Sequence, residues 1–295
     1  MNIDFSSVRQ LIGAAEAENT AISAIVLRQS ALDMGADEGA VLARMSHSLG
    51  VMKASVQEGL TPGLLSASGL TGDQASVLRQ YVGSGKSLSG KLLGEALYAS
   101  MAVMSSNACM GRIVAAPTAG SSGVIPGCFL AVAADRGMSD DVLVRGLLHA
   151  AGIGMVIAKN ATIAGAVGGC QAECGSAAAM TASAIVEMMG GTPGMCGHAA
   201  AHALKSLMGL VCDPVAGLVE EPCVTRNAAA SSIAIISADM ALAGITSIIP
   251  IDEVIAAMYE VGQALPEALR ETALGGIAAT PTARRIENAL FGGSV

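Results

Sequence analysis

The feature that most constrains this chain is its lack of large aromatic side chains. Its 295 residues contain no Trp, three Phe and three Tyr, whereas Gly occurs 36 times and Met 16 times. Apolar residues make up 52% and charged residues 14% of the chain, which excludes an intrinsically disordered protein. A core without aromatic rings must be filled by Ala, Leu, Ile, Val and Met, packed closely against Gly and Ala surfaces.

Apolar residues recur at spacings of three and four over most of the chain, which is the pattern of amphipathic helices. Plausible Ser, Thr or Asp caps precede several of these segments, and alternating strand-like runs are scarce. The sequence therefore predicts an all-α fold: a single compact helical domain of about ten helices over residues 1–295. It divides into an amino-terminal helical portion, 1–90, and a core portion, 91–295. The predicted helices are 7–17, 20–34, 37–57, 73–81, 91–110, 123–134, 140–158, 171–189, 193–208, 225–243 and 252–263.

The net charge and the positions of proline and aspartate in the apolar stretches argue against two classes of protein. The net charge of −8 and the few aromatic rings are unlike the basic footprint of a nucleic-acid binder. The mean hydropathy of +0.58 makes a membrane protein the first rival. However, the uncharged stretch 113–134 contains Pro117 and Pro126, and the stretch 227–250 carries Asp239 near its middle. We therefore expect no nucleic-acid partner and no membrane, and keep a small-residue membrane transporter as an alternative.

The cysteines and the amino-terminal sequence indicate the compartment. The opening MNIDFSSVRQ has no apolar core of signal-peptide length, so no secretory signal is expected. The seven cysteines, an odd number, favour free thiols or metal ligands over a disulfide framework. We expect a cytoplasmic protein.

Four glycine-punctuated loops hold a disproportionate share of the polar residues and prolines: 83–90, 115–123, 159–175 and 209–226. Loops of this kind in a helical protein often converge to build a site, although each could equally be a tight connection. The GSGKS run at 83–87 lacks the first glycine of a phosphate loop and follows a helix, so nucleotide hydrolysis is not expected.

Histidines and cysteines give weaker signals. His198 and His202 have zinc-like spacing, but their HAAAH sequence lacks the glutamate of a zinc protease motif. Cys109 and Cys128 lie in apolar helical stretches and are expected to be buried hydrophobes. The remaining cysteines lie in a turn-like stretch or in the loops, with a spacing that matches neither a zinc ribbon nor a ferredoxin: Cys170, Cys174, Cys196, Cys212 and Cys223. From spacing alone, both metal binding and a structural role stay open.

Three motifs make the chain recognisable. APTAGSSGVIPG at 116–127, GGCQAE at 168–173 and GLVCDPVAGLVEEPC at 209–223 closely resemble the α chain of the iron–sulfur L-serine dehydratase family. The resemblance extends to AATPT at 278–282, so it covers nearly the whole chain. It implies that the 91–295 portion binds a 4Fe–4S cluster and that no pyridoxal phosphate is used. The implied cluster ligands are Cys170, Cys212 and Cys223, whereas Cys174 does not fall on a ligand position.

The resemblance also implies a reaction. Three thiolates leave one iron without a protein ligand, and that iron acts as a Lewis acid on the hydroxyl group of L-serine, which is converted to pyruvate and ammonia. Some family members end in a cysteine that binds this iron at rest, but the present chain ends FGGSV at 291–295. Two-chain members carry a separate β chain, so a β subunit is the expected partner. Alternatives are a related lyase acting on L-cysteine or L-threonine and, less favoured, an electron-transfer protein.

Candidate residues for binding and catalysis lie in the loops. The turn 118–123 offers hydroxyl groups and, if it opens a helix, backbone N–H groups for the substrate carboxylate. The candidate substrate-binding residues are Thr118, Ser121, Ser122 and Asn160. Removal of the Cα proton needs a positioned base, for which the local candidates are Lys86, Lys159 and Glu173. The four histidines lie outside the motif loops, so the base is expected on the β chain.

Overall fold

The computed structural model describes residues 5–292. Within that range it contains thirteen α-helices, several short 3₁₀ segments, one short π-helix and no β-strand. The helices are α1 (Val8–Ala17), α2 (Ile22–Met34), α3 (Glu38–Gly59), α4 (Gln74–Gly83), α5 (Gly90–Ala108), α6 (Val124–Arg136), α7 (Asp140–Asn160), α8 (Gly165–Gly168), α9 (Ser176–Met188), α10 (Pro193–Ser206), α11 (Cys223–Leu242), α12 (Ile251–Ala264) and α13 (Pro281–Phe291).

The predicted all-helical single domain is confirmed, with thirteen helices rather than about ten. The additions are α8, which is a single turn, and α13, which begins at the Thr280 cap with Pro281 in its first turn. Cys196, expected in a turn, lies in α10 instead. The carboxyl-terminal residues 293–295 and the first four residues lie outside the described range, and with them most of the tail and part of the opening segment considered above.

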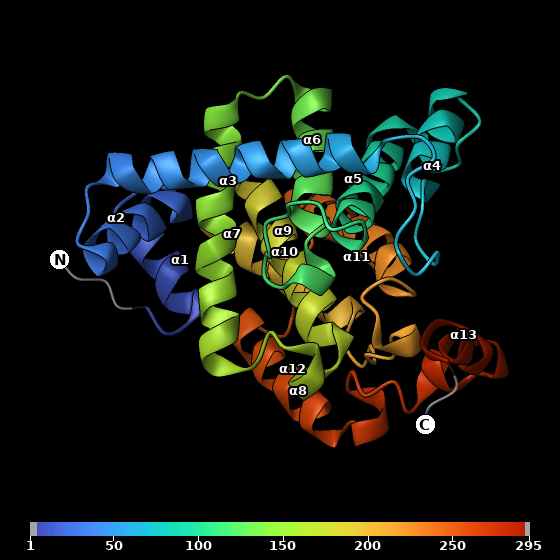
Figure 1. Ribbon diagram of the computed structural model, residues 1–295. Helices are drawn as coiled ribbons and strands as arrows, with labels where there is room; N and C mark the ends of the chain where they lie inside the picture. The colour runs from blue at the N-terminus through green and yellow to red at the C-terminus, as the bar shows by residue number, and fades with distance from the viewer. Residues whose placement is uncertain (1–4, 293–295) are drawn as a thin grey trace.

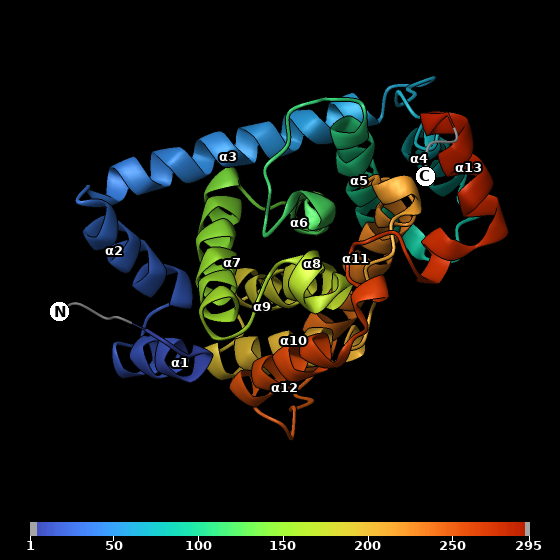
Figure 2. The same ribbon diagram turned by 60° about the horizontal axis from the view of Figure 1, so that its bottom comes forward.

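Helix α9 lies at the centre of the molecule. Its residues 176–186 are all buried, and it packs against α6, α7, α10 and α11. Figure 2 shows α3 along one side and α10 with α12 along the opposite side, with α7 and α9 between them. Helix α13 lies at the edge of the molecule, where it contacts the short 3₁₀ segments Val215–Gly217 and Gly276–Ala279 (Figure 1). The buried centre is therefore built from one Ala-rich helix and its neighbours.

The amino-terminal helices belong to the same core. Side chains of α1, α2 and α3, such as Leu11, Val26 and Leu49, form one continuous apolar cluster with those of α6, α7, α9, α10 and α12. The division of the chain at residue 90 stays a prediction, since the packing described here crosses it.

One helix of the described part, α7, is long and apolar enough to cross a membrane. Two thirds of its most apolar window, 67%, is buried against other helices of the molecule, as expected for a core helix. The two stretches singled out by hydropathy behave differently: 113–134 is a loop followed by α6, and 227–250 is the rest of α11 and the turn after it.

Small residues allow the helices to approach closely. A side chain at Gly59, the last residue of α3, would overlap the backbone carbonyl of Ala102 in α5. At Gly127 in α6, an added Cβ would lie 2.8 Å from atoms of Ala96 and Ser100 in α5. These contacts explain how a chain without Trp still builds a dense core.

This packing predicts opposite effects for two alanine substitutions in α3. Gly59→Ala should destabilise the protein by about 1–3 kcal/mol, because the new methyl group must displace backbone. The matched control Gly50→Ala, at an exposed position with nothing within 4 Å of the new Cβ, should stabilise it by about 0.5–1 kcal/mol. Chemical denaturation measures both, and equal effects would contradict the packing argument.

Candidate functional site

Three buried cysteines from three separate segments form the centre of the candidate site. Cys170 precedes the π-helix Gln171–Gly175, Cys212 lies in the loop before Val215–Gly217, and Cys223 is the first residue of α11. Burial and, to a smaller extent, the charge of Cys170 raise the pKa of the Cys223 thiol to about 12, and the same two causes raise the pKa of the Cys212 thiol well above its usual range. The three thiols are thus close enough to repel one another when ionised.

Cys174 lies beside this group. Its Sγ is 3.4 Å from the Sγ of Cys170, and both thiols are buried in or next to the π-helix. The hydrogen bond between them lowers the pKa of Cys170, against the effect of burial, and raises that of Cys174. A π-helical turn is uncommon and occurs often at functional sites, and here it places two thiols side by side.

Glu173 connects the cysteines to the Thr118–Gly123 turn. Thr118 Oγ1 donates a hydrogen bond of 2.6 Å to Glu173 Oε1. A Cβ added to Gly165 would lie 2.8 Å from Glu173 Oε2 and 3.1 Å from the Sγ of Cys212, so the missing side chain leaves room for both groups. Burial raises the pKa of the Glu173 carboxyl, and the hydrogen bond from Thr118 only partly offsets this.

The turn itself opens α6, as the sequence suggested. Its residues Ala119–Ser121 form a 3₁₀ segment that leads into α6 at Val124. The Oγ of Ser121 lies 3.1 Å from Thr118 Oγ1, while the Ser122 hydroxyl donates to the Ala119 carbonyl at 2.8 Å. The Thr118 hydroxyl therefore bonds directly to Glu173, and the fully buried Ser121 hydroxyl adjoins Thr118. The hydroxyl of Ser122 is turned back onto its own loop.

Asn227 and Gln171 are buried amides that the sequence analysis missed. Asn227 accepts from the Gly123 backbone N–H at 3.0 Å and donates to the carbonyls of Gly120 (2.7 Å) and Cys223 (2.9 Å), which joins the turn to α11. Gln171 accepts from Gly209 N–H at 2.8 Å and donates to the Met258 carbonyl at 3.0 Å. Each amide thus fixes a cysteine-bearing segment to a distant part of the chain.

Arg226 and Asp213 form a buried ion pair in the same place. Arg226 Nη1 lies 2.7 Å from Asp213 Oδ1 and donates to the Val211 carbonyl at 2.8 Å. Burial alone would lower the pKa of Arg226, but the nearby charges of Cys170 and Asp213 outweigh it and raise that pKa. Both residues were visible in the sequence as neighbours of Cys212 and Cys223, yet nothing in the pattern paired them.

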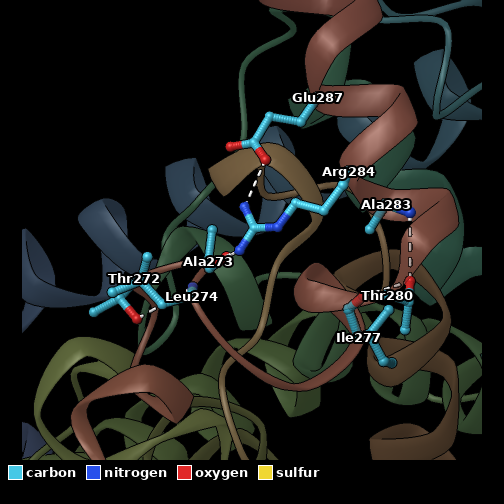
Figure 3. Close-up of polar contacts among 8 residues, drawn as sticks. All are labelled: Thr272, Ala273, Leu274, Ile277, Thr280, Ala283, Arg284 and Glu287. Atoms are coloured by element: carbon cyan, nitrogen blue, oxygen red, sulfur yellow. Dashed lines mark hydrogen bonds and ion pairs between the residues drawn. The ribbon is translucent and has the colours of Figure 1, made fainter. Parts of the chain in front are cut away.

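The segment after α12 covers Cys212. The backbone N–H of Cys212 donates to the Leu269 carbonyl at 2.9 Å, and that of Glu271 donates to the Cys212 carbonyl at 2.7 Å. Figure 3 shows how α13 holds this segment: Arg284 lies between Glu287, at 2.6 Å, and the Ala273 carbonyl, at 3.0 Å. The carboxyl-terminal helix therefore supports the cysteine site from outside.

The other candidate residues are Asn160, Lys159 and Lys86. Asn160 Nδ2 donates to the carbonyls of Ser6 and Val156, both at 2.8 Å, which favours a structural role at the end of α7. Lys159 is exposed in the last turn of α7, and Lys86 is exposed in the loop between α4 and α5. Among the described residues, no hydrogen bond or ion pair joins Lys86 to a cysteine-bearing segment. Among the base candidates, Glu173 bonds to Thr118 of the turn that adjoins the cysteine-bearing segments.

The histidines also serve other parts of the fold. His149 is fully buried, with Nδ1 2.8 Å from Glu187 Oε2 and Nε2 2.7 Å from the Ser183 hydroxyl. His202 Nε2 lies 3.1 Å from the Ile245 carbonyl, and His198 accepts from Ser247 N–H at 3.2 Å. Within residues 5–292, no group of three His, Cys, Asp or Glu side chains is arranged to hold a single metal ion.

Comparison with known proteins identifies relatives of this chain. The family model described as "Serine dehydratase alpha chain" matches residues 17–278. A "Probable L-serine dehydratase, alpha chain" of Bacillus subtilis is 51% identical over 99% of this chain and 97% of its own length. The "L-serine dehydratase, alpha chain" of Peptoniphilus asaccharolyticus is 43% identical over 95% and 96%. "L-serine dehydratase 1" of Escherichia coli is 37% identical, over 79% of this chain and 53% of the longer relative.

The family match covers the segments that carry Cys170, Cys212 and Cys223, the Thr118–Gly123 turn and the Arg226–Asp213 pair. Both α-chain relatives align over nearly their whole length, so the similarity extends well beyond the motifs. The chain belongs to the serine dehydratase alpha chain family.

Proposed function

We propose that this chain is the α subunit of an L-serine dehydratase, a lyase that converts L-serine to pyruvate and ammonia. The observation that carries the proposal is the meeting of three buried thiols with the Glu173–Thr118 contact, all within the family match. Its relatives in B. subtilis and P. asaccharolyticus are named as L-serine dehydratase α chains. All seven cysteines are free thiols, which suits a reducing cytoplasm.

The thiols Cys170, Cys212 and Cys223 would hold a 4Fe–4S cluster. The donor set supports this, because soft thiolate ligands favour iron–sulfur clusters over hard cations. A four-iron cluster is larger than one ion, so its ligands need not stand as close together as those of a single metal ion. When bound, the cluster supplies a Lewis-acid iron that makes the substrate hydroxyl a better leaving group. Cys174 is a hydrogen-bonding neighbour of one ligand in this proposal.

The Thr118–Gly123 turn would bind the substrate. The hydroxyls of Thr118 and Ser121 lie at the start of α6, where the backbone favours an anion such as the α-carboxylate of serine. Glu173 accepts from Thr118 and so orients this hydroxyl pair. Ser122 and Asn160, whose polar groups bond to the backbone elsewhere, are left out of the proposed substrate contacts.

The proton acceptor would come from a β subunit. Lys86 and Lys159 are exposed away from the cysteines, and Glu173 already accepts the Thr118 hydrogen bond. The naming of the relatives as α chains implies a second chain, and the E. coli relative is about twice as long as the part matched here. The partner would cover the 115–123 and 159–175 loops and complete the site.

Replacing any one of Cys170, Cys212 or Cys223 by Ser should lower the iron content of the anaerobically prepared protein and abolish serine turnover. The control Cys128→Ala removes a thiol that is buried in the apolar core and donates to the Ser231 carbonyl in α11, so the variant should keep its iron and lose about 1–2 kcal/mol of stability. Iron analysis and a pyruvate assay decide the matter; full activity with intact iron in one Ser variant rejects that ligand.

Ser121→Ala should lower kcat/KM for L-serine by about tenfold, equivalent to about 1.4 kcal/mol of transition-state stabilisation. Asn160→Ala is the control, with an expected kcat/KM within about threefold of the parent. Steady-state kinetics with the partner chain present measure both values. A Ser121→Ala enzyme as active as the control would remove the turn from substrate binding.

The cluster-loaded chain alone should show no serine turnover, because it lacks a positioned base. Adding the β chain should restore pyruvate formation from L-serine. Assays with L-threonine and L-cysteine in place of L-serine measure the substrate specificity of the pair. The measurement is pyruvate release under anaerobic conditions, with and without the partner. Equal activity in both cases would place the base on this chain and direct attention to Glu173.

A further inference from the structure

The Arg226–Asp213 ion pair lies inside the cysteine site but has no part in the proposed binding of substrate. The Asp213 carboxylate is 2% exposed and the Arg226 side chain 15% exposed, so both charges are largely withdrawn from water. Withdrawing two charges from solvent is costly unless each is well paired. Each of the two buried charges therefore needs well-placed partners.

Arg226 contacts both neighbours of Cys212. Nη1 reaches both the Val211 carbonyl and the Asp213 carboxylate, the two residues on either side of Cys212. Arg226 itself stands three residues after Cys223, in the first turn of α11. One side chain thus fastens the loop that carries one cysteine to the helix that carries another.

The second carboxylate oxygen of Asp213 adds a third segment. Asp213 Oδ2 accepts a hydrogen bond of 2.6 Å from the Ile277 backbone N–H. Gly276, at φ +61°, lies so close to this carboxylate that an added side chain would collide with it. The Thr280 hydroxyl, at the start of α13, donates a hydrogen bond to the Ile277 carbonyl and so holds this segment (Figure 3). The ion pair therefore joins the Cys212 loop, α11 and the carboxyl-terminal segment at one point.

These contacts are made by the chain's own residues and join three segments at one point. The geometry therefore favours a site that is assembled before the cluster arrives.

We propose that Arg226 and Asp213 are a positioning pair that locks the Cys212 loop to the Cys223 helix and thereby determines how firmly the chain retains its cluster. The inference rests on the proposed cluster and concerns its retention rather than the chemistry of serine. Groups just outside a metal's ligands commonly change its retention by about 10–100-fold when removed. Without the pair, the Cys212 loop would move away from Cys223 and admit competing ligands.

The experiment uses the full chain loaded with iron under anaerobic conditions. The variants are Arg226→Gln and Asp213→Asn, which remove one charge each, and Arg226→Lys, which keeps the charge but replaces the planar guanidinium group by an ammonium group. The control is Arg28→Gln, which breaks the Arg28–Glu18 ion pair between α1 and α2, away from the cysteines. The readouts are iron per chain, the visible absorption of the cluster, and the rate of iron release to a ferrous chelator.

We expect Arg226→Gln and Asp213→Asn to release iron at least about tenfold faster than the parent. Arg226→Lys should lie between them and the parent, and Arg28→Gln should stay within about twofold. Because the two residues act as one unit, the double variant should release iron no faster than the faster single variant. Multiplied effects in the double variant would overturn the idea of a single clamp.

Circular dichroism of each variant at the assay temperature separates loss of the cluster from unfolding. Faster release with an unchanged helical signal supports the inference, and Arg226→Lys carries the test if a charge-removing variant does not fold. Release rates within twofold of the parent in all three variants would overturn it. A parent chain that binds no iron would instead overturn the proposed function, so the two failures are distinguishable.

Discussion

The constraint on which this site depends is the burial of several thiols in one place. Burial raises the pKa of Cys212 and Cys223, so their surroundings oppose the ionised form that the proposed cluster would need. Several contacts hold the cysteine-bearing segments in place. They are made by the Arg226 cation, by the Asn227 and Gln171 amides, and by backbone hydrogen bonds to the segment after α12. Each of these contacts fixes a cysteine-bearing segment to another part of the chain.

Glycine residues allow the cysteine-bearing segments and their neighbours to pack closely. Gly120 and Gly165 let the backbone approach the Glu173 carboxylate, and Gly165 also leaves space beside the Cys212 thiol. Gly123 similarly allows the start of α6 to lie against the backbone of α5 at Ser100. Glycine thus has the same effect in the core and in the site. In both places the missing side chain lets two backbone segments, or a backbone segment and a buried side chain, approach closely.

Three of the four glycine-rich loops converge, as the sequence analysis anticipated for loops of this kind. Loops 115–123, 159–175 and 209–226 meet around the cysteines through Thr118, Glu173, Gly165 and Asn227. Loop 83–90 lies between α4 and α5, and its hydrogen bonds among the described residues stay within that region. Glycine content alone therefore did not separate a site loop from a tight connection, because both need the same backbone freedom.

The sequence by itself determined the helical class, most helix positions, the reliance on small residues and the motif cysteines, because periodicity and local motifs are encoded in neighbouring residues. Only the tertiary structure decided that Arg226 pairs with Asp213, that Asn227 bridges the turn to α11, and that Asn160 serves the end of α7. It also placed α13 as a support for the segment that covers Cys212. A buried polar group takes whichever partner the packing of distant helices brings to it, and no local pattern records that choice.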